Sequence, residues 1–373
     1  MRVCLFGCGG FIGSHLVEWL LSHSDAEIVG TDIDHQKVRH LLGDERFTYY
    51  DSDLRHDTQL TRHLVETSDV VVNLVAIANP AVYTRDPLHV FQLDFMENLK
   101  VAELCAELGR RLIQFSTCEV YGRTWLSLVP PGLIEPERAA ADIVMREDET
   151  PLIAGPVHKT RWIYAASKHL LERAINAYGQ SHGLDYTIIR PFNFIGPRFD
   201  YLPSTAPSGS ERSPRMFAQF MDALLRGTNM TLVDGGSAQR CFLYIDDASE
   251  CIGRIILDPL GVTSRQTFNI GNPANEASVT EFAELMLEVY RERYWDGVAP
   301  LPAMETVSGE TFFGAGYEDS DRRIPDISKA RRLLGWEPGW GLRELIEATM
   351  ESFVVADRQA TSRAITTPTA PTP

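Results

Sequence analysis

A tyrosine and a lysine four residues apart, Tyr164 and Lys168, stand at the start of a run of helix-forming residues. Positions i and i+4 lie on one face of a helix, so the lysine ammonium is expected near the phenol. A free tyrosine has a pKa of about 10, and a nearby cation favours its ionised form. The pair could therefore act as a general base toward an alcohol. An ordinary surface helix can carry the same spacing, so the pair alone does not identify a site.

A second polar group, residues 116–119 with the sequence Ser-Thr-Cys-Glu, follows an apolar run predicted to be a strand at 112–115. In a doubly wound sheet, ligands bind outside the carboxyl ends of the strands. We therefore expect Thr117, Cys118 and Glu119 to share a crevice with the tyrosine. A hydroxyl beside a Tyr–Lys pair and above a nicotinamide is the arrangement that oxidation of an alcohol requires.

A glycine-rich turn follows the first predicted strand, residues 2–6, and opens a helix predicted over residues 14–21. Its GxxGxxG spacing allows a tight turn and lets the backbone approach a pyrophosphate at the helix N-terminus. Asp32, which ends the second predicted strand, is placed to bind the adenosine ribose and would repel a 2′-phosphate, so we predict NAD rather than NADP. The expected cofactor contacts are Gly7, Gly10, Phe11, Ile12, Gly13, Asp32, Asp53, Leu74, Ala76, Tyr164 and Lys168.

Predicted strands and helices alternate through much of the chain. The further strands are expected at residues 47–50, 70–75, 112–115, 186–189 and 268–270, and helices at 90–107 and 167–180. Because strands separated by helices form parallel sheets, we predict a Rossmann-type α/β fold with a doubly wound parallel sheet. Asp53 could meet the adenine or be a solvent-facing loop acid. Leu74 and Ala76 end a strand in small or apolar groups suited to lie against the cofactor.

The composition changes after residue 195, where prolines cluster. We expect an NAD-binding domain over residues 1–195, with segments around 240–275 returning to it. A smaller mixed α/β substrate-binding lobe is predicted over 196–355, from helices at 216–225 and 279–290 and a strand at 231–233. The tail, 359–373, is rich in Thr, Pro and Ala and is predicted to be disordered.

The formal net charge of −16 argues against non-specific nucleic-acid binding. No segment approaches the run of about 20 apolar residues that a membrane span needs, and the N-terminus is predicted to be a strand rather than a signal peptide. The six cysteines show no metal-type spacing, so we predict no metal site and no disulfide. We expect a cytoplasmic protein without a membrane or nucleic-acid partner.

The GxxGxxG turn, Thr117, the YxxxK pair and the segment RPFNFIGP at residues 190–197 together resemble a known superfamily. They are similar to the extended short-chain dehydrogenases/reductases, in the NAD-dependent epimerase/dehydratase family that modifies nucleotide sugars. The match runs from residue 1 to about residue 355. The resemblance implies an enzyme that binds NAD and a UDP-sugar.

Within this family, three segments look like those of UDP-glucuronate decarboxylases, at residues 115–122, 161–164 and 316–325. The Thr-Cys-Glu triplet, an insertion around 123–150 and the Asp-Ser-Asp run resemble UDP-apiose/UDP-xylose synthases. Residues 74–85 and 155–159 resemble more the decarboxylase domain of the bifunctional polymyxin-resistance enzymes. Either branch implies NAD-dependent decarboxylation of UDP-glucuronate through a 4-keto intermediate, giving UDP-xylose, UDP-apiose or UDP-4-keto-pentose.

The resemblance also implies roles for the residues of the crevice. Tyr164 takes the proton from the 4-hydroxyl while Thr117 holds that oxygen. Glu119 and Arg323 match the positions for proton relay and reprotonation of carbon 5. Cys118 stands where the apiose branch has a catalytic thiol and ordinary xylose synthases have serine, although it could be only a small buried residue.

Other positions align with the family's substrate contacts, namely Ala78 and Tyr83 in the sugar pocket and Asn193, Arg215, Arg240 and Tyr317 around the nucleotide sugar. The apiose branch has a second cysteine where this chain has Ala78, which puts ring contraction in question. Arg161 could meet the substrate carboxylate or brace the loop, and each arginine could instead be a solvated charge. Asp319 aligns with an acid of the apiose branch or belongs to a solvated face.

Other functions make different demands on these positions. A 4,6-dehydratase would carry Asp where Cys118 stands, and a 4-epimerase would not need Glu119 with Arg323. Redox-sensing proteins of this fold usually lack the Tyr–Lys pair, which favours an enzyme over a binding or structural module. The alternative to a decarboxylase is therefore another NAD-dependent nucleotide-sugar 4-epimerase or 4,6-dehydratase. The resemblance also implies a homodimer formed through the helices at 90–107 and 167–180.

Overall fold

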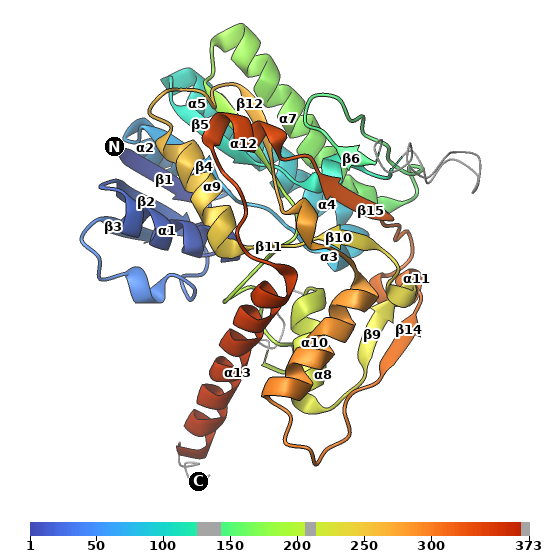
Figure 1. Cartoon of the computed structure of the whole chain (residues 1–373). Coiled ribbons are helices and arrows are strands. Elements are labelled where there is room, and N and C mark those ends of the chain that lie inside the picture. Colours follow the sequence, from blue (N-terminus) through green and yellow to red (C-terminus); the bar gives the residue numbers. More distant parts are fainter. Residues whose placement is uncertain (125–142, 206–213, 367–373) are drawn as a thin grey trace, which may run out of the picture.

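Seven parallel strands form the central sheet of the protein (Figure 1). The structure is a computed structural model that describes residues 1–124, 143–205 and 214–366, with side chains as far as residue 359. The strand order is β12-β7-β5-β4-β1-β2-β3. The strands are β1 (Arg2–Phe6), β2 (Glu27–Asp32), β3 (Phe47–Asp51), β4 (Val70–Asn73), β5 (Arg111–Phe115), β7 (Tyr186–Pro191) and β12 (Gln266–Ile270). The predicted Rossmann-type doubly wound sheet is confirmed, and its order reverses between β1 and β4, where such sheets bind ligands.

Alternate residues of β1 show why the sheet is covered on both faces. Val3 and Leu5 pack into one hydrophobic cluster, to which α1 (Phe11–His23) and α9 (Ile245–Leu257) also contribute. Cys4 and Phe6 point to the other side, into a cluster formed with α5 (Asn98–Leu108) and α7 (Ile163–His182). Successive side chains of a strand face opposite sides, so a fully apolar strand requires two covered faces.

The predicted strand over 70–75 ends at Asn73, and residues 74–79 form a loop before α3 (Pro80–Arg85). Asn73 is fully buried, and its side chain accepts from the Val75 N–H, which turns the chain away from the sheet. The two apolar residues after Asn73 therefore lie in the loop rather than in the strand.

The single helix predicted over 90–107 is instead α4 (Pro87–Phe91), a π-helical turn η2 (Gln92–Glu97) and α5. A π-helical turn inserts one extra residue per turn and rotates the side chains that follow, and such turns are frequent at functional sites. Here it places Asp94 in the interior, with none of its surface exposed.

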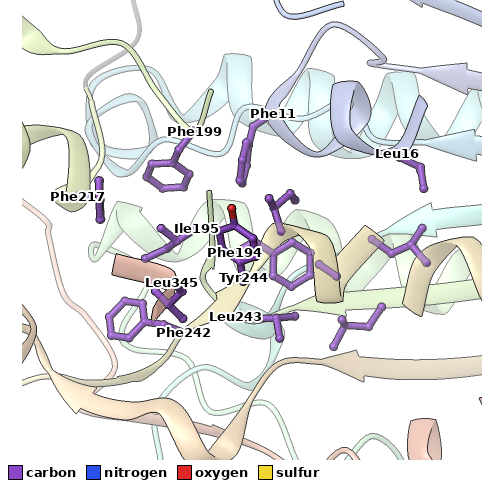
Figure 2. Packing of buried hydrophobic residues seen from close by; sticks show 14 of the residues in the cluster. Phe11, Leu16, Phe194, Ile195, Phe199, Phe217, Phe242, Leu243, Tyr244 and Leu345 are labelled. Carbon is purple, nitrogen blue, oxygen red and sulfur yellow. The ribbon is translucent and has the colours of Figure 1, made fainter. Parts of the chain in front are cut away.

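The second lobe packs α8 (Met216–Arg226), α10 (Val279–Arg293) and α13 (Leu342–Thr366) beside the parallel pair β9 (Met230–Val233) and β14 (Met304–Val307). Phe199 and Phe217 meet there, and Phe199 makes an edge-on contact with Phe11 at the start of α1, with ring centroids 5.1 Å apart (Figure 2). The same hydrophobic cluster therefore joins the glycine turn to the second lobe.

A four-stranded sheet lies between the two lobes, with the order β13 (Glu276–Ser278), β10 (Gln239–Cys241), β15 (Arg322–Pro325) and β6 (Val144–Met145). β8 (Phe194–Ile195) and β11 (Leu243–Tyr244) form a separate parallel pair, and after β10 the chain returns to the large sheet through β11, α9 and β12. Segments far apart in sequence therefore meet at the edge of the large sheet.

The C-terminal tail was expected to be disordered from residue 359, but α13 continues to Thr366. The last residues of that prediction, 367–373, lie outside the described residues. All six cysteines are buried and free. None of the described helices has the length and the apolar character needed to cross a membrane.

Candidate active site

Tyr164 lies in the first turn of α7 and is 5% exposed. Its ring stacks on that of Tyr83 from α3, with centroids 4.6 Å apart and planes 9° apart. Thr117 lies close enough to act on the pKa of the phenol, and it caps the short 3₁₀ helix η3 (Cys118–Tyr121) by accepting from the Glu119 N–H at 3.2 Å. The structure therefore places the predicted tyrosine and threonine close together.

Lys168 lies one turn further along α7 and is buried. Its Nζ donates to the Phe115 carbonyl oxygen at 3.3 Å and lies 3.5 Å from Asp94 Oδ1. Burial, together with Asp94 and Glu119, raises the pKa of Tyr164 well above its usual value. In the protein alone these effects outweigh the lowering expected from Lys168, whose ammonium is paired with Asp94.

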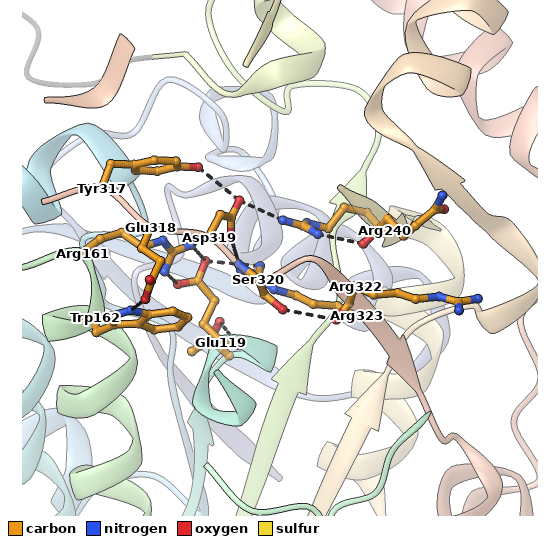
Figure 3. A network of polar contacts seen from close by, with 12 residues as sticks. Glu119, Arg161, Trp162, Arg240, Tyr317, Glu318, Asp319, Ser320, Arg322 and Arg323 are labelled. Carbon is orange, nitrogen blue, oxygen red and sulfur yellow. Dashed lines mark hydrogen bonds and ion pairs between the residues drawn. The ribbon is translucent and has the colours of Figure 1, made fainter. Parts of the chain in front are cut away.

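Five charged side chains, Glu119, Arg161, Arg240, Asp319 and Arg323, form an arginine–carboxylate cluster beside Thr117 (Figure 3). They come from η3, from η5 (Thr160–Trp162), from β10, and from β15 with the loop before it. Arg240 and Arg323 are direct partners in the parallel pairing of β10 with β15, so both side chains point to the same face of that sheet.

Glu119 is bound through both carboxylate oxygens. Arg161 contacts Oε2 through Nη1 and Oε1 through Nη2, the latter at 2.9 Å, and Arg323 Nη1 lies 3.4 Å from Oε1. Burial alone would raise the pKa of Glu119, but the two guanidinium groups outweigh it and lower the pKa. Glu119 is therefore an ionised carboxylate in this structure.

Asp319 contacts three guanidinium groups and one phenol. Its carboxylate lies 2.7 Å from Arg323 Nη2, 2.8 Å from Arg240 Nη2 and 3.4 Å from Arg161 Nη2, and the Tyr317 hydroxyl donates to it at 3.1 Å. The arginines overcome the effect of burial and hold the pKa of Asp319 far below its usual range. Of the two interpretations of Asp319, the solvated face is wrong.

Arg161 is 2% exposed, with its guanidinium above the rings of Tyr83 and Trp162 at 5.8 and 5.3 Å from their centroids. Among the described residues, the buried Nε atoms of Arg161 and Arg323 have no hydrogen-bond partner. Buried donors of this kind are costly to leave without a partner. Arg161, Arg240 and Arg323 are thus not solvated surface charges.

Cys118 is 4% exposed and packs with Val120, Tyr121, Met145 and Phe192. Burial raises the pKa of its thiol, although Arg323 and Arg240 act in the opposite direction. The thiol thus borders the arginine–carboxylate cluster and is mainly protonated at neutral pH.

The remaining predicted substrate residues surround this cluster at different depths. Tyr317 is 9% exposed and stacks on Phe313, with centroids 4.4 Å apart. Asn193 has a left-handed backbone (φ 41°) and donates to the Cys241 carbonyl oxygen at 3.1 Å, next to Arg240 in the chain. Ala78 is exposed in the loop of residues 74–79. Tyr317 is therefore bound to the cluster directly, whereas Asn193 is connected to it through the backbone of β10.

The glycine turn has the shape that a dinucleotide requires. Gly7 has a left-handed backbone (φ 86°), and a Cβ at Gly9 would overlap the Asp34 carbonyl oxygen. The Gly9 N–H donates to Asp32 Oδ2 at 2.9 Å, which fixes the predicted ribose-binding acid against the turn. Gly10 precedes α1 without a side-chain cap, so the first N–H groups of that helix remain available to a pyrophosphate.

Two predicted residues form pairs away from the arginine–carboxylate cluster. Asp53 accepts from Arg55 Nε through both oxygens and from Nη2 at 2.6 Å through Oδ2, so it is an ion-paired loop acid. Arg215 binds Asp200 at 3.0 Å and lies over the Phe199 ring, 3.8 Å from its centroid. Arg215 contacts the segment after β8 and Phe11, not the cluster.

Sequence reasoning missed Gly9, Asp94 and Glu318. Gly9 could have been found as the extra glycine inside the GxxGxxG turn. Glu318 accepts from Trp162 Nε1 at 2.7 Å and so holds the ring on which Arg161 lies. Asp94 carried no signal, because an acid in a helical pattern is expected at the surface.

Comparison with known proteins shows which family the chain is similar to. Residues 3–271 match the model of the NAD dependent epimerase/dehydratase family. UDP-D-apiose/UDP-D-xylose synthase 1 of Arabidopsis thaliana is 41% identical over 98% of this chain and 95% of its own length. UDP-D-apiose/UDP-D-xylose synthase of Oryza sativa subsp. japonica is 42% identical, with coverage of 94% and 88%. The crystal structure of the PbgP3 protein from Burkholderia pseudomallei superposes with a TM-score of 0.80 at 35% identity, with coverage of 96% and 98%.

Proposed function

The chain belongs to the NAD-dependent epimerase/dehydratase family, and from this premise we propose that it catalyses NAD-dependent decarboxylation of UDP-glucuronate. The proposal is supported by the two similar synthases, which match the chain over nearly its full length. The product is a UDP-pentose formed by way of a 4-keto sugar.

The residues of the glycine turn fit NAD. The turn from Gly7 to Gly13 would hold the pyrophosphate, Asp32 would bind the adenosine ribose, and Lys168 would reach the nicotinamide ribose. Bound NAD supplies the acceptor and donor of the two electrons that carbon 4 of the sugar loses and regains.

Tyr164 is the group that takes the proton from the 4-hydroxyl of the sugar. Thr117 lies close to the phenol, so one sugar oxygen can contact both side chains. Because the pKa of Tyr164 is raised in the protein alone, base function requires positive charge beside the phenol, which Lys168 and the oxidised cofactor provide.

The ketone formed at carbon 4 is β to the 5-carboxylate, so carbon dioxide can leave while the electron pair is held as an enolate. The unpartnered Nε atoms of Arg161 and Arg323 are donors suited to the substrate carboxylate. Glu119 is ionised between the same two arginines and can move a proton only when that pairing loosens on substrate binding. Arg323 positions Glu119 and stabilises the enolate by its charge, and carbon 5 takes its proton from water or from Glu119 after the carboxylate has accepted one from water.

One observation carries the proposal: Arg323, from the far end of the chain, lies 3.4 Å from Glu119, which follows Thr117 by two residues. Alcohol oxidation alone would not need a buried arginine–carboxylate cluster beside the tyrosine and threonine. The test is incubation of the purified protein with UDP-glucuronate and NAD, with products identified by NMR. Release of carbon dioxide is expected; a 4-epimerase or a 4,6-dehydratase would retain the carboxyl carbon, and that result would refute the proposal.

The product is proposed to depend on Cys118. Its thiol lies beside Arg323 and Arg240, where it could take part in opening and contracting the sugar ring. Ala78, on the exposed loop, provides no second thiol. The NMR product analysis distinguishes UDP-xylose, UDP-apiose and UDP-4-keto-pentose directly.

We further propose that the protein forms a homodimer through α5 and α7, which pack against each other on one face of the sheet. Large apolar side chains are exposed nearby, on α4, η2 and α7, at Leu88, Met96 and Leu170. Two such helix pairs would form a four-helix bundle and cover these side chains. Light scattering should give twice the mass of the chain, and Met96→Glu should shift the protein toward a monomer.

A further inference from the structure

Asp94 is a fully buried carboxylate in η2, the π-helical turn that interrupts a long helical segment. Its two oxygens lie 3.2 and 3.3 Å from the Ile77 backbone N–H, which donates to them, and Oδ1 lies 3.5 Å from Lys168 Nζ. Burial raises the pKa of Asp94 to about 6, and Lys168 and the Ile77 N–H act against this. Apolar residues of similar volume often stabilise a core as well as a buried ion pair does, so stability alone does not account for this one.

The two partners of Asp94 belong to different parts of the site. Lys168 lies on α7, one turn after Tyr164, whereas Ile77 lies in the loop of residues 74–79. That loop leads into α3, whose Tyr83 stacks on Tyr164. A single carboxylate therefore connects the lysine to the loop expected along the cofactor.

We propose that Asp94 is a positioning residue for the Tyr164–Lys168 pair, holding the lysine ammonium and the loop of residues 74–79 in one arrangement and balancing the lysine charge beside the phenol. This rests on the proposed function, because it takes Tyr164 as the base. The proposal assigns Asp94 no direct contact with the sugar. Its effect on the reaction passes through Lys168.

The charges around Tyr164 and Lys168 indicate the direction in which removing the charge of Asp94 should change the pKa of Tyr164. After burial, Asp94 is the largest contribution that raises the pKa of Tyr164, followed by Glu119, with a smaller one from Cys118. Lys168 is faced by Asp94 and Glu172. Removing the charge of Asp94 leaves the lysine charge unbalanced next to the phenol, so the pKa of Tyr164 should fall.

The variant is Asp94→Asn, and the reaction measured is formation of NADH on the enzyme in a single turnover, as a function of pH. In the plot of this rate against pH, the part that rises with pH (the rising limb) should move to lower pH by about one unit in the variant. The maximal rate should fall by about 10- to 100-fold, because the lysine loses its position. A limb that stays in place or moves to higher pH would overturn the proposal. The matched control is Glu97→Gln, which removes a carboxylate from the same π-helical turn that is paired with Lys100 instead.

A second readout does not depend on turnover. The Kd for NAD, measured by calorimetry, should rise by about tenfold in Asp94→Asn, corresponding to the loss of one good hydrogen bond. In a Lys168→Met background the same substitution should change the Kd much less, because the residue through which Asp94 acts is gone. Equal effects in both backgrounds would show that Asp94 does not act through Lys168.

If Asp94→Asn does not fold, Asp94→Glu preserves the charge and changes the reach, and it should weaken NAD binding without moving the pH limb. If Asp94→Glu also moves the rising limb of the pH–rate profile, Asp94 does not act by balancing the charge of Lys168. NADH formation is separate from release of carbon dioxide. A protein that oxidises the sugar without releasing carbon dioxide refutes the proposed function while leaving the Asp94 test intact.

Discussion

Arg323 Nη1 lies 3.4 Å from Glu119 Oε1, although 204 residues separate the two side chains in the chain. Arg323 is on β15 of the small sheet, and Glu119 follows β5 of the large sheet. Arg323 is buried and Glu119 is mostly buried, and both also bind a further charged partner, Asp319 and Arg161 respectively. This ion pair joins the two sheets at the point where the sugar carboxylate is expected.

Replacing Arg323 should stop decarboxylation more than it weakens binding. Arg323→Ala should lower the rate of carbon dioxide release by about 100- to 1000-fold, because a donor that stabilises developing negative charge is lost. The matched control is Arg322→Ala on the same strand, whose side chain points to the opposite face and binds Glu276 at 2.8 Å. A rate near that of the wild type in Arg323→Ala would remove this residue from the mechanism.

Acid should reduce the stability that the arginine–carboxylate cluster contributes to the folded protein. The pKa of Asp319 and that of Glu119 are lower in the folded protein than in the unfolded chain. Their contribution to stability is therefore present at neutral pH and is lost as the pH falls below about 5.

Asp319→Asn tests this pH dependence. It should lower the free energy of unfolding by about 2 to 3 kcal/mol at neutral pH, since it leaves three guanidinium groups without their shared carboxylate. It should also flatten the loss of stability between about pH 5 and 3. Urea unfolding at several pH values measures both effects. Asp321→Asn, which removes a carboxylate bound to the Thr124 hydroxyl, should keep the steeper acid dependence of the wild type.

Cys118→Ser should change the products rather than the rate of decarboxylation. The serine preserves the small buried side chain but removes the thiol that borders Arg323 and Arg240. We expect carbon dioxide release within about threefold of the wild type and loss of any UDP-apiose among the products, because only ring contraction needs the thiol. Product ratios by NMR give the answer, and Cys105→Ser, on α5, controls for loss of a buried thiol elsewhere. Undiminished UDP-apiose would show that Cys118 is a packing residue.

Gly9→Ala should damage the cofactor site directly. A Cβ at Gly9 would overlap the Asp34 carbonyl oxygen and press on the Asp32 side chain, so the turn has to shift. The Kd for NAD should rise by at least about tenfold, as expected when a backbone cradle is displaced. Gly43→Ala is the matched control, because a Cβ there meets nothing within 4 Å. Equal NAD affinities in the two variants would contradict the assignment of the glycine turn.

The sequence by itself determined the parts of this protein that depend on local pattern. Alternating apolar strands and amphipathic helices specify the doubly wound sheet, since each element must bury its apolar side chains. The glycine turn with Asp32, and Tyr164 one helical turn before Lys168, can be read because turns and helices fix spacing over a few residues. The resemblance to a family then named the further residues of the site.

Only the tertiary structure decided how those residues are paired. Arg161, Arg240 and Arg323 carry no sequence signal that distinguishes them from surface arginines, and their burial around Asp319 results from the meeting of β10, β15 and η5. The same holds for Asp94, which a π-helical turn directs into the core beside Lys168. Charge pairs between distant segments depend on how the layers pack, and they set the pKa of each group. The spacing of Tyr164 and Lys168 therefore predicted their proximity, but Asp94 determines how much of the lysine charge the phenol experiences.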